Sequence, residues 1–467
     1  MERLAGAVGV AAELEPVPPA MTELRLAARV ARPEGLLDLS RSEPLPIPLS
    51  DTCAERVAEQ FMRARQYSPP AGLMPVRDAA ARYASTRTGL EIRAGAVAIT
   101  AGAMAGLAVA LHVLVGPGDE VLVPVPYFPS YPKQIAMLGG IPRLVDTRPL
   151  QGELTPEAVE RELSPRTRAL LLCNPGNPAG VVLDRDRLAA ILAVLPPDVA
   201  VIADEVYAEY VYGAETRGRP AGDDADGGEE DGVREDLVAD GRETGGEIPA
   251  SAGFVSVLSV ATDEDAGREV VALDTASKTA AMPGWRVGTA VGTPGLTPRL
   301  AQAASTLSGA PNTLAQLAFA AWLDDPPQLD RMAPYRPRLR DVLEPLADAG
   351  LTVRPPDGSY YVWATAGDGS PRLDSGDDGS IAPAGDGAQP AANGANSAPP
   401  FGSAEAALEL ARRAGALVWP GVLFGDLRSV RVSLGVPRRE LRDGVRRLTD
   451  SWREVREGDV PSSRSRR

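Results

Sequence analysis

Short runs of aliphatic and β-branched residues alternate with helix-like segments along most of this chain. Six of these runs, which we expect to form strands, cover residues 96–100, 119–125, 168–173, 199–204, 270–275 and 286–292. Helices are expected between them, for example at residues 103–115 and 185–195. This alternation favours an α/β fold with a mostly parallel sheet between helices. Ligands of such sheets bind at the carboxyl ends of the strands, so residues there are the first candidates for chemistry.

Two acidic segments interrupt the alternation. Residues 213–250 and 366–402 are rich in Gly, Ala and Asp, and they contribute −8 and −4 of the net charge of −15. Because they hold almost no aromatic residues, they cannot bury enough apolar surface to offset the entropy lost on ordering. We therefore expect both segments to be mobile surface insertions.

The composition excludes several classes of function. A Ser-His-Asp or Cys-His arrangement could be built only around the single histidine, His112, and its apolar surroundings favour a core histidine. The two cysteines, Cys53 and Cys173, are too few for a disulfide framework or a cysteine-based zinc site, and no metal site is expected. The apolar stretch at residues 105–115 is too short to span a membrane, and no basic stripe with interleaved aromatics indicates nucleic acid. The first residues of the sequence resemble a secretory signal peptide only poorly, so we expect a cytoplasmic protein.

Lysine is scarce, and one of the two lysines occupies a notable position. Only Lys133 and Lys278 occur in the chain. Lys278 follows the predicted strand at 270–275, in the string SKTAAMPGWRVG. A lysine amine can form an imine with an aldehyde cofactor where a low-polarity pocket and nearby cations lower its pKa. Taken alone, a lysine after a strand is more often a surface residue.

Other candidates stand at the ends of the remaining strands. Asp204 closes one of them, in IADEVYAEY, where a carboxylate can cap the next helix or face a pyridine nitrogen. Residues 174–180 read NPGNPAG, which is typical of a tight turn. Gly102, Ala103 and Met104 stand where a strand turns into a helix, and the free amides of such a turn bind anions.

In this order the strings resemble those of the class I/II, fold-type I aminotransferases, which depend on pyridoxal 5′-phosphate. The resemblance covers about residues 30–450 outside the two insertions. It implies that Lys278 carries the cofactor as a Schiff base and that Arg286 binds the cofactor phosphate. It implies that Asp204 faces the ring nitrogen, that Tyr207 and Asn177 bond the ring 3′-oxygen, and that Asn177 also contacts the substrate.

The same resemblance gives roles to five further positions. The turn at residues 102–104 resembles the phosphate loop of the family, and Thr275 stands where the family has a hydroxyl for the phosphate. Phe128, in VPVPYFPSYP, matches an aromatic that stacks on the pyridine ring. Tyr67 matches a tyrosine that reaches the phosphate of a neighbouring subunit, and Arg431, in SVRVSLG, matches the arginine that holds the substrate α-carboxylate.

The resemblance also implies an architecture and a reaction. We expect a large domain at residues 56–325 and a smaller α+β domain built from the two chain ends, at residues 1–55 and 326–467. The active unit would be a homodimer with shared sites. The reaction would move an amino group from an L-amino acid to a 2-oxo acid.

Two positions depart from the family pattern, and two alternatives stay open. Ala179 replaces a threonine, and Ser42, in LDLSRSEP, replaces a glycine near the substrate carboxylate, so the substrate class is open. A pyridoxal-phosphate-dependent lyase, such as a carbon–sulfur β-lyase or an enzyme resembling ACC synthase, would use the same residues. A non-catalytic regulatory relative is the third interpretation, although residues 1–35 are too short for the winged helix of such relatives.

Overall fold

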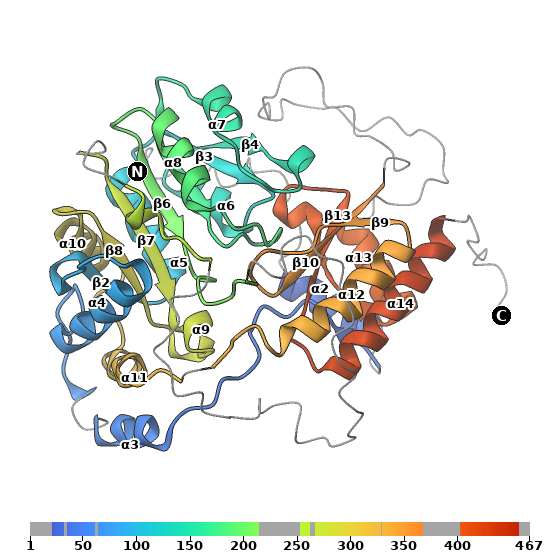
Figure 1. Cartoon of the computed structure of the whole chain (residues 1–467), viewed down its shortest axis with the longest axis horizontal. Coiled ribbons are helices and arrows are strands. Elements are labelled where there is room, and N and C mark those ends of the chain that lie inside the picture. Colours follow the sequence, from blue (N-terminus) through green and yellow to red (C-terminus); the bar gives the residue numbers. More distant parts are fainter. Residues whose placement is uncertain are drawn as a thin grey trace, which may run out of the picture. The chain divides into compact units, whose positions relative to one another are not determined.

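The computed structural model describes residues 21–31, 35–60, 64–213, 253–261, 267–327, 329–367 and 402–456. It divides into two compact units (Figure 1). The large unit comprises Ser42–Leu339 and Pro355–Tyr361, and the small unit comprises Met1–Arg41, Arg340–Arg354 and Val362–Arg467. Nearly all of the two expected insertions lies outside the described residues. The domain boundaries expected after residues 55 and 325 stay a proposal.

The large unit is built on a seven-stranded sheet in the order β2-β8-β7-β6-β5-β3-β4. All neighbouring strands pair in parallel except β8, which is antiparallel to both β2 and β7. This confirms the expected α/β fold with a mostly parallel sheet. The strands are β2 (Val97–Thr100), β3 (Glu120–Val125), β4 (Ile141–Asp146), β5 (Thr167–Cys173), β6 (Ala200–Asp204), β7 (Val270–Thr275) and β8 (Gly288–Gly292).

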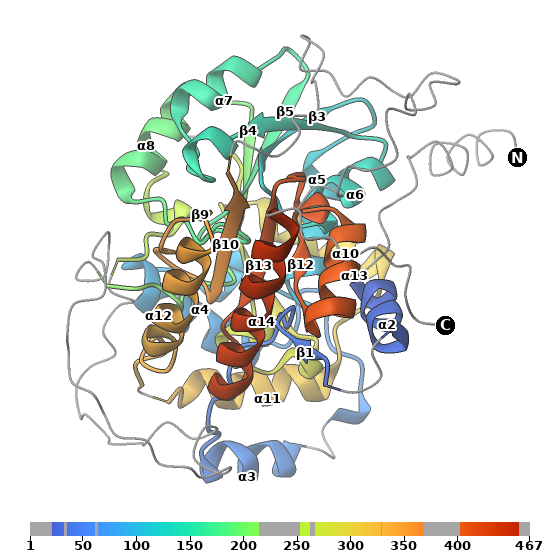
Figure 2. The ribbon, with the colours of Figure 1, turned by 90° about the vertical axis from the view of Figure 1, so that its right-hand side faces the viewer.

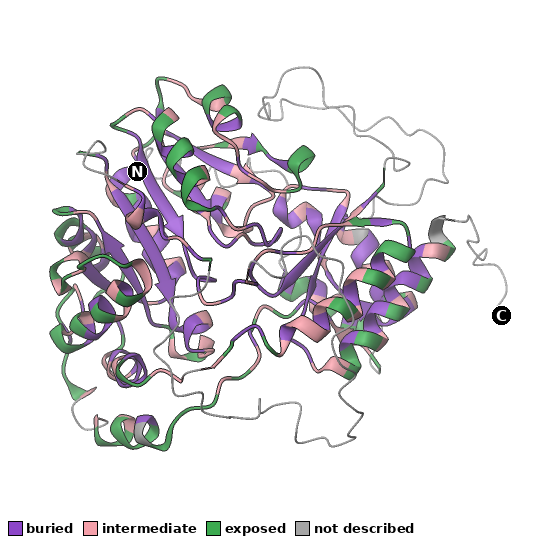
Figure 3. Cartoon of the chain, viewed as in Figure 1, coloured by how far each residue is buried: buried purple, intermediate pink, exposed green. Residues whose placement is uncertain are grey.

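Strand β4 is the one strand of this seven-stranded sheet that the sequence analysis did not predict. It lies at the edge of the sheet, and its residues alternate between exposed and partly buried positions. Its sequence, IPRLVD, contains a proline and an arginine, which edge strands tolerate and central strands avoid. The other strands are buried along all or most of their length, as the mostly purple arrows in Figure 3 show, and their apolar runs made them visible in the sequence.

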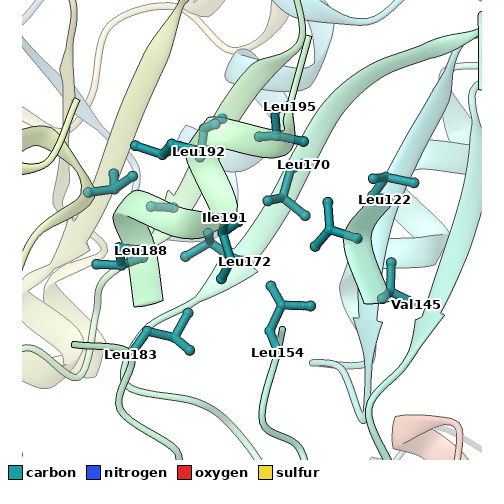
Figure 4. Packing of buried hydrophobic residues seen from close by; sticks show 14 of the residues in the cluster. Leu122, Val145, Leu154, Leu170, Leu172, Leu183, Leu188, Ile191, Leu192 and Leu195 are labelled. Atoms are coloured by element: carbon teal, nitrogen blue, oxygen red, sulfur yellow. The ribbon is translucent and has the colours of Figure 1, made fainter. Parts of the chain in front are cut away.

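Helices pack on this sheet through apolar side chains. Leu170 and Leu172 of β5 contact Leu188, Ile191 and Leu192 of α8 in one buried cluster (Figure 4). Helix α5 packs instead against β6, β7 and β8. The helices of the large unit are α3 (Asp51–Gln60), α4 (Met74–Thr88), α5 (Ala103–Leu114), α6 (Ser130–Met137), α7 (Pro156–Glu162), α8 (Arg185–Val194), α9 (Ala276–Thr279), α10 (Leu296–Leu307) and α11 (Thr313–Asp324).

The small unit joins the two ends of the chain. Strand β1 (Leu37–Asp38) pairs in parallel with β11 (Ala416–Leu417). A second sheet has the order β12-β13-β10-β9, and helix α13 packs against both α2 and α14 (Figure 2). Helix α12 (Tyr335–Asp348) and strand β10 (Tyr361–Ala366) each begin in the large unit and continue into the small one. The remaining elements are α2 (Met21–Ala31), β9 (Leu351–Val353), α13 (Ala404–Ala414), β12 (Trp419–Pro420), β13 (Ser429–Ser433) and α14 (Arg438–Arg456).

Candidate active site

Lys278 lies just beyond the carboxyl end of β7, in the short helix α9. Thr275 ends the strand and caps the helix, because its hydroxyl accepts a hydrogen bond from an amide of the first turn. Two side chains then bind backbone carbonyl groups at the end of this short helix. The hydroxyl of Tyr210 donates to the Lys278 carbonyl at 2.9 Å, and the guanidinium of Arg331 donates to the Thr279 carbonyl at 2.7 Å. The large unit therefore fixes the backbone of Lys278 by itself.

The amine of Lys278 points at one backbone oxygen. Its Nζ donates to the carbonyl of Ser42, and the hydroxyls of Tyr360 and Tyr361 donate to the same oxygen at 2.9 and 3.2 Å. Nζ also lies 5.9 Å from the ring centroids of Tyr207 and Tyr360. A carbonyl oxygen has two lone pairs, so three donors compete for it. The amine can therefore leave this oxygen without leaving it unsatisfied, which suits a group that reacts.

Asp204 ends strand β6 and is buried, with 9% of its surface exposed. Its Oδ2 accepts a hydrogen bond from the hydroxyl of Tyr131 at 2.6 Å, and its Oδ1 accepts one from the Val206 amide at 3.4 Å. Burial raises the pKa of Asp204 to about 6, and these two hydrogen bonds act in the opposite direction. Cys173, opposite Asp204 on strand β5, is partly buried, and desolvation raises the pKa of its thiol.

Asn177 and Tyr207 contact one another through their polar ends. The Nδ2 of Asn177 donates to the Tyr207 hydroxyl at 3.3 Å, and that hydroxyl lies 3.2 Å from the hydroxyl of Tyr361. Asn174 fixes the turn that carries Asn177, since its side chain donates to the carbonyl of Leu183 and accepts from the amide of the same residue. Asn177 and Tyr207 are both buried. Two candidates for a ring oxygen are thus neighbours in the large unit.

An arginine lies beside the start of helix α5. Gly102 precedes the helix with a φ of +87°, a conformation that favours glycine. The first amides of the helix, those of Ala103 and Met104, have no carbonyl of an earlier turn to bond. The guanidinium of Arg286 donates to the Ala101 carbonyl at 3.4 Å, and a Cβ on Gly102 would lie 2.8 Å from its Nη2. Free amides, the helix dipole and a guanidinium together make an anion-binding site.

Two hydroxyls adjoin this site in different ways. The Nη1 of Arg286 donates to the hydroxyl of Ser277 at 3.2 Å. The hydroxyl of Thr275, the residue singled out in the sequence, lies 3.1 Å from the Ser277 hydroxyl and 3.1 Å from the Val287 carbonyl. Ser277 is therefore the hydroxyl in contact with Arg286.

The three remaining candidates have different surroundings. The ring of Phe128 meets that of Tyr131 edge-on, with 5.6 Å between centroids. Tyr67 is fully exposed. Arg431 lies on strand β13 of the small unit, where it is buried and its guanidinium carbon lies 4.9 Å from the centroid of the Trp419 ring.

The structure adds residues that the sequence analysis did not single out. Tyr131 follows Phe128 by one helical turn, a spacing that could have drawn attention to it. Tyr361 begins strand β10, and Tyr360 directly precedes it. Ser277 directly precedes Lys278. The sequence alone does not indicate whether the hydroxyl of Thr275 or that of Ser277 contacts Arg286.

The comparison with known families decides what this arrangement is. The family model for aminotransferase class I and II matches residues 36–448. The chain belongs to this family. In the described part of this aminotransferase no group of His, Cys, Asp and Glu is arranged to hold a metal ion, and no helix is long and apolar enough to cross a membrane.

Individual relatives agree with the family. The aminotransferase is 29% identical to a probable aspartate/prephenate aminotransferase of Thermus aquaticus, over 66% of this chain and 72% of the relative. It is 26% identical to the aspartate aminotransferase of Geobacillus stearothermophilus, over 64% and 68%. These names confirm the prediction of an enzyme that transfers amino groups.

Solved structures agree with the fold. The structure is similar to that of the Thermus thermophilus aspartate aminotransferase with maleate, with a TM-score of 0.71 at 25% identity over 93% of this chain and 96% of the other. The aspartate aminotransferase from Rhizobium meliloti gives a TM-score of 0.72 at 23% identity, which shows the shared fold. The expected fold-type I architecture is confirmed.

Proposed function

We propose that this aminotransferase holds pyridoxal 5′-phosphate in its large unit, with Lys278 as the residue that bonds the cofactor aldehyde. The observation that carries the proposal is that one end of one sheet presents every kind of group that the cofactor needs. Arg286 and the start of α5 offer an anion site, and Asp204 offers a buried carboxylate for the ring nitrogen. Asn177 and Tyr207 offer adjacent polar groups for the ring oxygen. When bound, the cofactor supplies an electron sink for bond breaking at the substrate Cα.

The chain's own residues would divide the remaining work. The Lys278 amine can leave the Ser42 carbonyl, because two tyrosine hydroxyls also donate to that oxygen. It is therefore suited to take a proton from the substrate Cα and to return it. Arg431 would hold the substrate α-carboxylate. Its planar guanidinium can donate two parallel hydrogen bonds to a carboxylate, which a lysine amine cannot do. Thr275, Ser277 and the turn at 102–104 would complete the phosphate site.

We further propose that the active form is a homodimer and that the protein is cytoplasmic. A fully exposed tyrosine is unusual for a side chain of this size, and Tyr67 is the residue for which the family resemblance implies a role across a subunit interface. The presence of only two cysteines supports a reducing compartment. Because the relatives include enzymes named for aspartate, L-aspartate is the first amino donor to test.

The absorption spectrum of the purified protein with added pyridoxal phosphate tests the proposal. We expect a near-visible band that is absent in Lys278→Ala, that an amino donor removes and that a 2-oxo acid restores. A band in the wild type that persists in Lys278→Ala would overturn the assignment of the lysine. Release of ammonia and a 2-oxo acid without any amino acceptor would favour the lyase alternative.

A further inference from the structure

One tyrosine is bonded to the carboxylate that would face the cofactor ring. Tyr131 lies in the first turn of α6, and only 2% of its surface is exposed. Its hydroxyl donates to Oδ2 of Asp204 at 2.6 Å, a short distance of the kind seen for charge-assisted hydrogen bonds. In the described part of the chain it is the one side chain that donates a hydrogen bond to Asp204. Neither the composition nor the family resemblance assigned it a role.

We propose that Tyr131 is a positioning residue that keeps Asp204 in its charged form and leaves Oδ1 as the oxygen available to a protonated cofactor ring. The inference rests on the proposed function, since it concerns how the chain retains pyridoxal phosphate.

The surroundings of Asp204 show why a donor is needed there. Burial favours the neutral carboxylic acid, and Asp274 of β7 and the thiol of Cys173 on β5 add no positive charge. Lys278 of α9 is the cation that acts on Asp204, and its Nζ is engaged with a carbonyl. The amide of Val206 is distant at 3.4 Å. Tyr131 therefore supplies the short hydrogen bond that opposes the desolvation of this carboxylate.

The backbone and the ring of Tyr131 are held in place by Phe128. Its backbone amide donates to the Phe128 carbonyl at 3.0 Å, and its ring packs edge-on against the Phe128 ring. The same tyrosine lines a pocket of about 40 Å³ together with Tyr127, Cys173 and Asn177. This pocket has room for water beside the ring, so removal of one hydroxyl requires no rearrangement of the backbone.

A phenylalanine at this position should have an effect that depends on pH. Without the hydroxyl, the charged form of Asp204 loses a donor, so its pKa rises further. As the pH falls through that higher pKa, Asp204 becomes neutral and can no longer pair with a ring cation. Affinity for the cofactor should therefore weaken on the acidic side, and the weakening should begin at a higher pH in Tyr131→Phe than in the wild type.

The test is a titration of cofactor-free protein with pyridoxal phosphate at several pH values between about 5 and 8.5, a range that brackets the wild-type pKa of about 6 and the higher pKa expected in the variant. Tyr131→Phe is expected to bind roughly tenfold more weakly at neutral pH, because it lacks one hydrogen bond to a charged group. The acidic limb of its binding curve should lie at a higher pH. Tyr127→Phe, a tyrosine of the same pocket, is the matched control and should follow the wild type.

Three results would overturn the inference. Wild-type affinity in Tyr131→Phe at every pH would do so, and so would an equal loss at every pH, which indicates packing alone. The third comes from Asp204→Asn: if Tyr131→Phe weakens binding as much in that background as in the wild type, the tyrosine does not act through the carboxylate. Failure of the wild type to bind the cofactor at all would instead reject the proposed function, and the inference with it.

Discussion

Two buried aspartates stand at the ends of neighbouring strands, yet they have different partners. Asp204 ends β6 with 9% of its surface exposed, and Asp274, next to the last residue of β7, has 6% exposed. Asp274 forms an ion pair with Arg87, with 2.5 Å between Nη1 and Oδ2. Among the described residues no arginine or lysine lies within ion-pair distance of Asp204, and its Oδ2 accepts from the neutral hydroxyl of Tyr131.

Under the proposed function, this difference separates a scaffold carboxylate, Asp274, from one that would face the cofactor, Asp204. Burial acts to lower the pKa of the Arg87 guanidinium, but the Asp274 carboxylate, helped by Tyr83, Glu205 and Glu209, raises it, and the net shift is upward. The other oxygen of Asp274 accepts from the hydroxyl of Thr279 at 2.6 Å, in the helix that carries Lys278. Asp274 is thus satisfied within the protein and holds the lysine in place. Asp204 keeps its capacity to pair with a cation that binds later.

The largest expected effect is on folding, and it concerns Asp274. In Asp274→Asn the guanidinium of Arg87 stays buried without its ion-pair partner, so the free energy of unfolding should fall by about 3–5 kcal/mol. Urea unfolding of the cofactor-free protein measures it. Asp324→Asn is the control, because it breaks an exposed ion pair with Arg82 and should cost no more than about 1 kcal/mol. Equal unfolding midpoints for the two variants would contradict a scaffold role for Asp274.

The next effect is on catalysis, and it concerns Asp204. We expect Asp204→Asn to fold normally and to lose about 100- to 1000-fold in kcat/KM for amino transfer, because a preorganised charge at the reacting group is missing. Measured at saturating cofactor, Asp274→Asn should lose activity only in proportion to its unfolded fraction. Full activity in Asp204→Asn would remove the functional distinction between the two aspartates.

The pH dependence of stability gives a third, smaller test. The pKa of Asp204 is raised to about 6 in the folded chain, from about 4 in the unfolded chain. A raised pKa stabilises the fold below about pH 4, and this contribution is lost as the pH rises through about 6, up to about 3 kcal/mol by pH 7. The free energy of unfolding of the cofactor-free wild type should therefore fall relative to Asp204→Asn between about pH 4 and pH 7. Parallel curves for the two proteins would contradict the raised pKa.

The sequence pointed to Asp204 as a candidate but not to the ion pair between Asp274 and Arg87. Asp204 could be predicted because it ends an apolar strand in a recognisable string. The pair of Arg87 with Asp274 could not, because 187 residues separate the two and only the tertiary fold joins them. The bond from Tyr131 to Asp204 is equally non-local, at 73 residues. A residue at the end of an apolar strand can be recognised from the neighbouring sequence. The residues that stabilise its charge come from distant elements, so only the tertiary structure identifies them.

The smallest expected effect tests whether the hydrogen bonds of Asp274 influence Asp204. Thr279→Val keeps the shape of a buried side chain but removes the hydroxyl that donates to Asp274, which retains Arg87 and the Thr275 amide at 2.6 Å. We expect the free energy of unfolding to fall by about 1–2 kcal/mol, as for one hydrogen bond to a charged group. The pH profile for cofactor binding should stay that of the wild type.

The contrast with Tyr131→Phe makes this small change informative. Each variant removes one hydroxyl donor from one buried aspartate, so a general loosening of the sheet end would affect both in the same way. A shifted cofactor profile in Thr279→Val would show that Asp274 influences the charge of Asp204 as strongly as Tyr131 does. If the pH profile of cofactor binding is unchanged in Thr279→Val but shifted in Tyr131→Phe, the charge of Asp204 is controlled by Tyr131 of α6. Asp274 then acts only by supporting the helix that carries Lys278.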